Sequence, residues 1–377
     1  MFETPQHTQR KPLTDELHAR PFTPIEPPAQ ALYVALMPEA DQARRSPKED
    51  LAHLNALLAH LGAAPAMADG DRAPNFYLGA FDGFRLKWER HTEFVSYLFE
   101  LEGPGPAPFT PRLAEIAPPA WIERASLRII SASVVEIIPA TDEDDAQRIA
   151  TEKLAPHFVR DSLALTWVTE RNAIAMGDFR IDAAGFTRFG VVALPDIGPR
   201  RLGRITQRLI EMETYRTLAM IALPVARRLG PELTRLETTL AEVTRSIAND
   251  DNARAPDPEV ERETLATLSA LSADLESLAA ETAFRFGGAR AYETIVYDRI
   301  AALREESLRS RQTFEEFMVR RFKPALRTVR STEERLQTLS IRGERAANLL
   351  RTRIDVSLEE QNQQLLKSMD DRAQLQL

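Results

Sequence analysis

The stretch Phe186–Met212, FTRFGVVALPDIGPRRLGRITQRLIEM, contains the point at which the character of the chain changes. Up to Leu194 it is a short apolar run with β-branched and aromatic residues, which is typical of a buried strand. Asp196-Ile197-Gly198-Pro199 interrupts the run, and from Leu202 the apolar residues recur every three or four positions, as in an amphipathic helix. The sequence therefore predicts an α+β fold in which a sheet domain, residues 1–195, precedes a helical region.

Upstream of this point the predicted elements follow an order that occurs twice. The first pass has a strand at 30–37, a helix that begins at Ser46-Pro47 and reaches about Leu61, and three strands at 76–81, 84–90 and 92–101, with Asp82-Gly83 as a hairpin turn. The second pass has a strand at 127–138, a helix at 141–154, and strands at 162–169, 173–181 and 186–194. The order β-α-β-β-β, taken twice, predicts one mixed sheet with flanking helices and an internal duplication.

Downstream, residues 196–288 are predicted to form a helical hairpin. Pro224 predicts a kink or break about one turn upstream, Gly230-Pro231 restarts the pattern, and Gly287-Gly288 is expected to end the second helix. Residues 289–377 then form a long stalk helix, in which Pro324 predicts another kink. The stalk carries a coiled-coil seam, whose members are Leu339, Gly343, Ala346, Leu350, Ile354, Leu358, Leu365 and Met369.

Composition narrows the function classes. The chain has 377 residues, a net charge of −8 and no Cys, which excludes disulfides, thiolate metal sites and cysteine nucleophiles. The acidic balance argues against nucleic acid as a partner. The longest apolar run, 218–226, is too short to cross a bilayer and contains a proline, so we expect the chain itself to be soluble.

Two clusters carry titratable side chains. In Lys87–Phe94, KWERHTEF, an extended backbone would place Glu89, His91 and Glu93 on one face, where they could bind a divalent metal or act as acid and base. The alternative is a strand-edge cluster with an ion pair to Arg90 or to a neighbouring strand. Glu16, His18 and Arg20, within ELHARPF, could form an anion clamp or a loop held by its own salt bridges.

Carboxylate side chains also occur along the predicted stalk helix. Asp355 and Glu359 lie one helical turn apart, and Asp370-Asp371 lies near the end. If several copies of the chain converge, these groups could line a cation path; in a single copy they are solvated surface. Residues 284–377 contain 18 Lys and Arg against 14 Asp and Glu, which fits either an approach to anionic lipid or a solvated helical face.

Three segments in this order, ELHARPF, KWERHTEF and LLRTRIDVSLEEQNQQLLKSM, resemble the bacterial family called domain of unknown function 3422, described as predicted membrane-anchored proteins. The resemblance covers essentially the whole chain. It implies a hydrophobic C-terminal membrane segment beyond the position of Leu377, so we expect the sequence to be the soluble part of a longer protein or a naturally short member of the family. No residue inherits a catalytic role from the family.

The order of an α/β domain, a helical hairpin and a long helix also looks like the cytoplasmic part of CorA-type magnesium channels. This resemblance implies a homo-oligomer that packs through its C-terminal helix at the cytoplasmic face of the bacterial inner membrane, with Mg²⁺ or another divalent cation as ligand. Two alternatives stay open: a metal-dependent or acid/base enzyme centred on Glu89, His91 and Glu93, and a membrane-tethered scaffold that docks partners through 202–278.

Overall fold

The structure is a computed structural model that describes residues 7–11, 13–14, 22–39, 45–67, 74–123, 127–250 and 258–374, without the side chains of 123, 249, 250, 258 and 370–374. It divides into two compact units. The sheet unit consists of Met1–Leu218 and Tyr292–Phe322, and the helical unit consists of Ala219–Ala291 and Lys323–Leu377. The fold class is α+β, as predicted.

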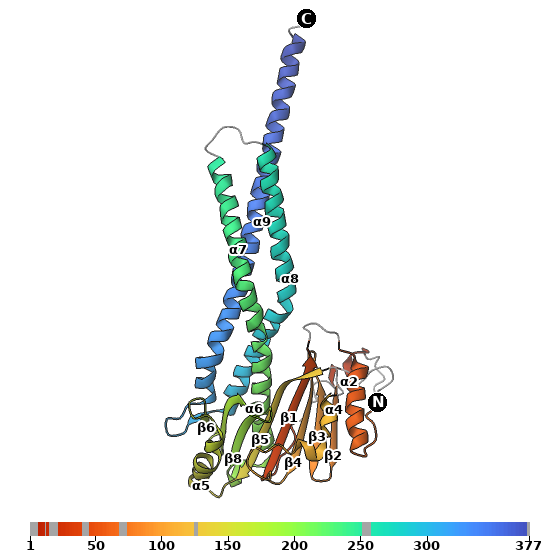
Figure 1. Cartoon of the computed structure of the whole chain (residues 1–377), viewed down its shortest axis with the longest axis vertical. Coiled ribbons are helices and arrows are strands. Elements are labelled where there is room, and N and C mark those ends of the chain that lie inside the picture. Colours follow the sequence, from red (N-terminus) through yellow and green to blue (C-terminus); the bar gives the residue numbers. More distant parts are fainter. Residues whose placement is uncertain are drawn as a thin grey trace. The chain divides into compact units, whose positions relative to one another are not determined.

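The sheet unit is built on one nine-stranded mixed sheet with the order β2-β3-β4-β1-β5-β8-β7-β6-β9 (Figure 1). The strands are β1 (Ala29–Pro38), β2 (Phe76–Phe81), β3 (Phe84–Arg90), β4 (Val95–Glu102), β5 (Leu127–Pro139), β6 (Ala164–Val168), β7 (Ala173–Ile181), β8 (Thr187–Ala193) and β9 (Glu306–Ser307). The predicted element order is confirmed: β1 is followed by α2 (Pro47–His60) and three strands, and β5 by α5 (Glu143–Arg148) and three strands.

The two passes pair differently, however. Strand β4 is antiparallel to β1, whereas β8 is parallel to β5. The repeat is therefore one of element order and not of strand direction.

One face of the sheet carries the largest part of the core. Because strand side chains alternate, Leu32, Val34 and Leu36 of β1 point to the same face. They join Trp88, Tyr97 and Phe99 and are covered by the leucines of α2. The remaining cover comes from α3 (Leu113–Ile116), α4 (Pro119–Glu123), α5, and the short π and 3-10 turns Ile149–Leu154 and Ala155–His157.

The opposite face is more polar and lies under α6 (Pro199–Met220). Here the alternate positions of the strands place Lys87 and Glu89 on β3, Ser96 and Glu100 on β4, and Ser131 on β5. α6 buries its apolar stripe here, as Leu202, Ile205 and Leu209 are fully buried. This face therefore holds buried charged groups, such as Lys87 and Glu100.

The helical unit consists of α7 (Ala222–Asp250), most of α8 (Pro258–Leu303) and most of α9 (Phe314–Gln374). The three helices run side by side, and α9 continues past the ends of the other two (Figure 1). Ion pairs join α9 to both neighbours, Arg335 to Glu237 at 2.6 Å and Arg353 to Glu261 at 3.0 Å. The buried layer is formed by Leu233, Leu236, Leu240, Leu268, Leu271, Leu275, Leu336, Leu339 and Leu350.

Several predicted helix ends differ from the structure. The break before Pro224 is present at Ile221, but α7 continues through Gly230-Pro231 and α8 through Gly287-Gly288. Phe286 and Ala289, on either side of these last glycines, are buried, and their packing outweighs the cost of about 1 kcal/mol for each helical glycine. The continuous stretch predicted from residue 289 is in fact interrupted at 304–313, where β9 pairs with β6.

The predicted stalk seam divides into two parts. Leu339, Gly343 and Leu350 are buried inside the helical unit, and a Cβ at Gly343 would lie 3.3 Å from Leu271. Ala346 and Ile354 are half-buried. Leu358, Leu365 and Met369 are exposed, at 48%, 60% and 65%. The first part of the seam is therefore used within the chain, and only the second part faces outward.

Candidate functional site

The KWERHTEF segment contains the last four residues of β3 and the four-residue turn that leads to β4. Strand β3 ends at Arg90, and the backbone N–H of His91 donates to the carbonyl of Phe94 at 2.8 Å, which closes the turn. The premise of an extended backbone through Glu93 was wrong, because the chain must reverse here for β4 to pair with β3. Glu89, His91 and Glu93 thus do not share one strand face.

Each of the three side chains has its own contact. Glu89 lies 3.2 Å from the ammonium group of Lys87, which is only 2% exposed. The ring of His91 stacks on Phe94 at 4.1 Å, and its Nε2 lies 3.3 Å from Ser96 Oγ. Glu93 accepts a hydrogen bond from the Tyr292 hydroxyl. Glu89 therefore has an ion-pair partner on its own strand, Lys87.

Glu89 and His91 line a cavity of about 320 Å³ in the sheet unit. Its walls come from the polar face of the sheet, from the β3–β4 turn, from α6 and from the C-terminal end of α8. The lining residues are Phe22, Tyr33, Lys87, Glu89, His91, Phe94, Leu98, Gln207, Arg208, Ile210, Glu211, Thr214, Tyr215, Arg299 and Ala302. Glu93 stands outside this set, although its partner Tyr292 stacks on Tyr215 at 5.4 Å.

The charged groups of the helical wall are connected. Glu211 forms an ion pair with Arg299 and accepts from the Gln207 amide at 2.6 Å. Arg208 donates to the backbone carbonyl of Ala302 at 2.8 Å. Burial lowers the pKa of Arg208, and the positive charges of Arg204 and Arg299 lower it further.

Tyr33 lines the cavity from the interior strand β1 of the sheet. Burial raises the pKa of its phenol far above the usual range, against the opposing effect of hydrogen bonds with Thr214 and Ser96. Tyr33 therefore stays neutral at any physiological pH. Its side chain offers a hydroxyl group and an aromatic surface, and no charge.

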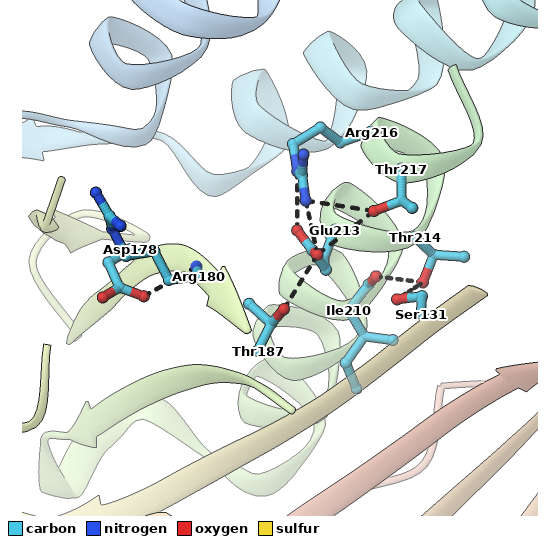
Figure 2. Close-up of polar contacts among 9 residues, drawn as sticks. All are labelled: Ser131, Asp178, Arg180, Thr187, Ile210, Glu213, Thr214, Arg216 and Thr217. Atoms are coloured by element: carbon cyan, nitrogen blue, oxygen red, sulfur yellow. Dashed lines mark hydrogen bonds and ion pairs between the residues drawn. The ribbon is translucent and has the colours of Figure 1, made fainter. Parts of the chain in front are cut away.

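A second polar cluster anchors α6 beside the cavity (Figure 2). Glu213, which is 3% exposed, accepts from Arg216 at 2.8 and 2.9 Å and from Thr187 Oγ1 of β8 at 3.2 Å. Thr214 Oγ1 lies 3.4 Å from Ser131 Oγ of β5. These contacts hold the helix on the sheet and so set the position of its cavity-lining residues.

The described part of the chain contains no group of three or more His, Asp or Glu side chains arranged to hold a metal ion. Of the other predicted site residues, Glu16, His18 and Arg20 lie outside the described residues. Asp355 and Glu359 are exposed on α9, and the side chains of Asp370 and Asp371 are not among those described.

The sequence prediction missed the helical half of the cavity. Arg208, Glu211 and Tyr215 lie on one face of α6, at i, i+3 and i+7, which was a readable signal. Arg299 gave no such signal, because it reaches the cavity from α8, about 90 residues further along the chain.

None of the helices in the described ranges has the length and hydropathy needed to span a membrane. No curated protein and no solved structure matches this chain. The family described as protein of unknown function (DUF3422) matches residues 5–377, which is nearly the whole sequence. The chain therefore belongs to the DUF3422 family.

Proposed function

We propose that the protein acts as a homo-oligomer whose copies associate through the outer part of α9, residues 355–374. The observation that carries this proposal is the exposure of that segment. From Asp355 to Met369 every side chain except Ser357 is exposed, and among the described side chains Arg353 makes the most C-terminal ion pair between α9 and a neighbouring helix of the unit. The segment extends for about 30 Å at 1.5 Å per residue.

The exposed segment carries an incomplete apolar stripe. Leu358 and Leu365 lie seven residues apart, and Met369 follows four residues later, as in the seam of a coiled coil. An isolated helix of about 20 residues with this many polar groups is marginal in water. Burial of each leucine against another copy would contribute about 1.5–3 kcal/mol. Pairing with a second copy thus gives the segment the partner that it lacks within one chain.

We also propose that this assembly works at the cytoplasmic face of a bacterial inner membrane, to which a C-terminal segment would attach it. The family resemblance and the basic balance of residues 284–377 support this location. An ion-transport role like that of CorA-type channels would need the carboxylates Asp355 and Glu359 of several copies around one axis, with Mg²⁺ or another divalent cation between them.

Light scattering on the purified chain tests the assembly. We expect oligomers over a range of concentrations, and dissociation when Leu358→Glu and Leu365→Glu are combined. The matched control, Gln361→Glu with Gln364→Glu, adds the same charge to the same exposed segment without removing apolar groups and should leave the oligomer intact. A parent chain that is a monomer at every concentration contradicts the proposal.

Light scattering also tests whether a divalent cation binds between the copies. Millimolar Mg²⁺ should increase the oligomer mass or stability of the parent, and Asp355→Asn with Glu359→Gln should remove that response. An identical response in parent and variant would rule out these two carboxylates as cation ligands.

The two alternative functions receive less support. For the acid/base enzyme, Glu89 and His91 do line one cavity, but Glu93 does not line it. A scaffold that docks partners through 202–278 would need free apolar faces, whereas Leu236, Leu268 and Leu275 are buried. Elemental analysis of the parent and of His91→Ala remains the test of a metal-dependent enzyme.

A further inference from the structure

Among the described residues that line the cavity of the sheet unit, cations outnumber carboxylates. Three cationic side chains line it, Lys87, Arg208 and Arg299, against the two carboxylates Glu89 and Glu211. Each carboxylate is already held by one cation: Glu89 by Lys87 at 3.2 Å, and Glu211 by Arg299. One positive charge, that of Arg208, is left without a carboxylate ion pair among the described residues.

Arg208 is placed where a positive charge is costly. It is half-buried, and burial, Arg204 and Arg299 all disfavour its charge, against a smaller favourable effect of Glu211. Its one hydrogen bond in the described structure goes to the neutral carbonyl of Ala302 at 2.8 Å, through Nη1. A guanidinium group has five N–H donors and matches carboxylate or phosphate oxygens in a bidentate arrangement. An anion bound at this position would therefore use donors that the chain does not occupy and would offset the repulsion.

The other walls define the rest of the ligand. Tyr33, Phe94 and Tyr215 present aromatic surface, and Phe94 packs edge-on against Tyr215 with ring centroids 6.3 Å apart. A volume of about 320 Å³ is at the lower end for ligand pockets, too small for a dinucleotide. Planar, partly apolar molecules fit such walls well.

We propose that this cavity binds a small organic anion, with its carboxylate or phosphate group on Arg208 and a planar apolar part against Tyr215 and Phe94. The ammonium group of Lys87, held by Glu89 at the opposite wall, supplies a second donor to polar substituents of the ligand. This proposal concerns the sheet unit alone and does not depend on the oligomer proposed above.

Titration calorimetry or ligand-observed NMR with three probes of similar shape tests the proposal. Benzoate and phenyl phosphate carry the anionic group, and benzamide is the neutral analogue. We expect the parent to bind at least one of the anions and to bind benzamide about tenfold more weakly or not at all, since hydrogen bonds to charged groups are the stronger ones. Comparison of benzoate with phenyl phosphate identifies which acid group the site prefers.

Variants of two arginines test whether the anion binds at Arg208. Arg208→Gln should lower the affinity for the preferred anion about tenfold and leave that for benzamide unchanged. Arg201→Gln is the matched control, because Arg201 is an exposed arginine of the same helix outside the cavity lining, and it should bind like the parent. Circular dichroism checks that both variants are folded.

The parent alone can overturn the proposal, so the test does not depend on the folding of Arg208→Gln. Equal affinity of the parent for benzoate, phenyl phosphate and benzamide would mean that the cavity does not select anions. Absence of binding by both anions up to about 10 mM, or unchanged affinity in a folded Arg208→Gln, would likewise refute it.

Discussion

Replacement of Gly203 by alanine is the sharpest test of how α6 is seated. A Cβ added at Gly203 would lie 1.9 Å from the carbonyl oxygen of Thr23 and 3.1 Å from its carbonyl carbon. Both atoms belong to the backbone, so no side-chain rotation relieves the overlap. The segment Thr23–Ile25 is held in place by two hydrogen bonds. The Ile25 N–H donates to the Pro199 carbonyl at 3.0 Å, and the Thr23 hydroxyl donates to Glu100.

The expected cost follows from these contacts. To restore an ordinary carbon–oxygen separation, the segment must move away by about 1 Å, which weakens both hydrogen bonds. Overpacking costs about 1–3 kcal/mol and each weakened hydrogen bond about 1 kcal/mol, whereas alanine regains about 1 kcal/mol of helix propensity. Gly203→Ala should therefore destabilise the sheet unit by about 2–4 kcal/mol.

Gly230→Ala is the matched control, because Gly230 is also inside a helix but a Cβ there meets nothing within 4 Å. It should stabilise the helical unit by up to about 1 kcal/mol. The three tryptophans, Trp88, Trp121 and Trp167, all belong to the sheet unit, so their fluorescence in urea reports unfolding of that unit. A Gly203→Ala protein whose fluorescence midpoint equals or exceeds that of the parent would refute the reasoning.

Three further predictions concern charged side chains, two of them buried or half-buried and one partly exposed. Glu213→Gln leaves the half-buried Arg216 without its carboxylate and should lower the free energy of unfolding by about 3 kcal/mol in urea titrations, and an unchanged midpoint would contradict the role of this pair. Burial, together with the charges of Glu315 and Glu316, raises the pKa of Glu305 to about 7, so the folded state binds this proton more tightly than the unfolded state. The protonated Glu305 therefore stabilises the fold below pH 4.5, and this stabilisation is lost as the pH rises to about 7. Over this range the free energy of unfolding of the parent should fall by about 3 kcal/mol more than that of Glu305→Gln. Parallel pH profiles of the two proteins would contradict this prediction. Arg335→Gln removes a partly exposed ion pair with Glu237 and should cost at most about 1 kcal/mol by helical circular dichroism in urea, so a larger loss would mean that this contact contributes more than a surface pair.

Local sequence signals predicted the elements that local chemistry determines. α2 begins at Pro47 as expected after Ser46, and Gly83 takes φ +74° in the two-residue turn between β2 and β3. Such features depend on a few adjacent residues. The strand β9 could not be predicted in this way, because a two-residue strand exists only through its pairing with Thr166 and Trp167, about 140 residues earlier.

The same distinction applies to the cavity. Lys87, Glu89 and His91 lie within five residues, and their polar character was readable in the sequence. The predicted strands 84–90 and 92–101 left one residue between them, whereas the structure uses 91–94 for the turn, so Glu93 does not lie on a strand. Arg208 and Arg299 belong to helices whose local patterns say nothing about which sheet residues they will meet. Their role depends on tertiary packing, which a single sequence does not reveal.

The discontinuous path of the sheet unit has a consequence for biosynthesis. This unit ends its first segment at Leu218 and is completed only by Tyr292–Phe322, so about 100 further residues must be translated before its last parts emerge. At 5–20 residues per second, this delay is about 5–20 s. Until then the nascent chain lacks β9, the neighbour of β6, and an unpaired strand edge is prone to intermolecular association. The β6 edge of the sheet thus stays unpaired for this period while the chain is on the ribosome, and slower elongation would lengthen the exposure.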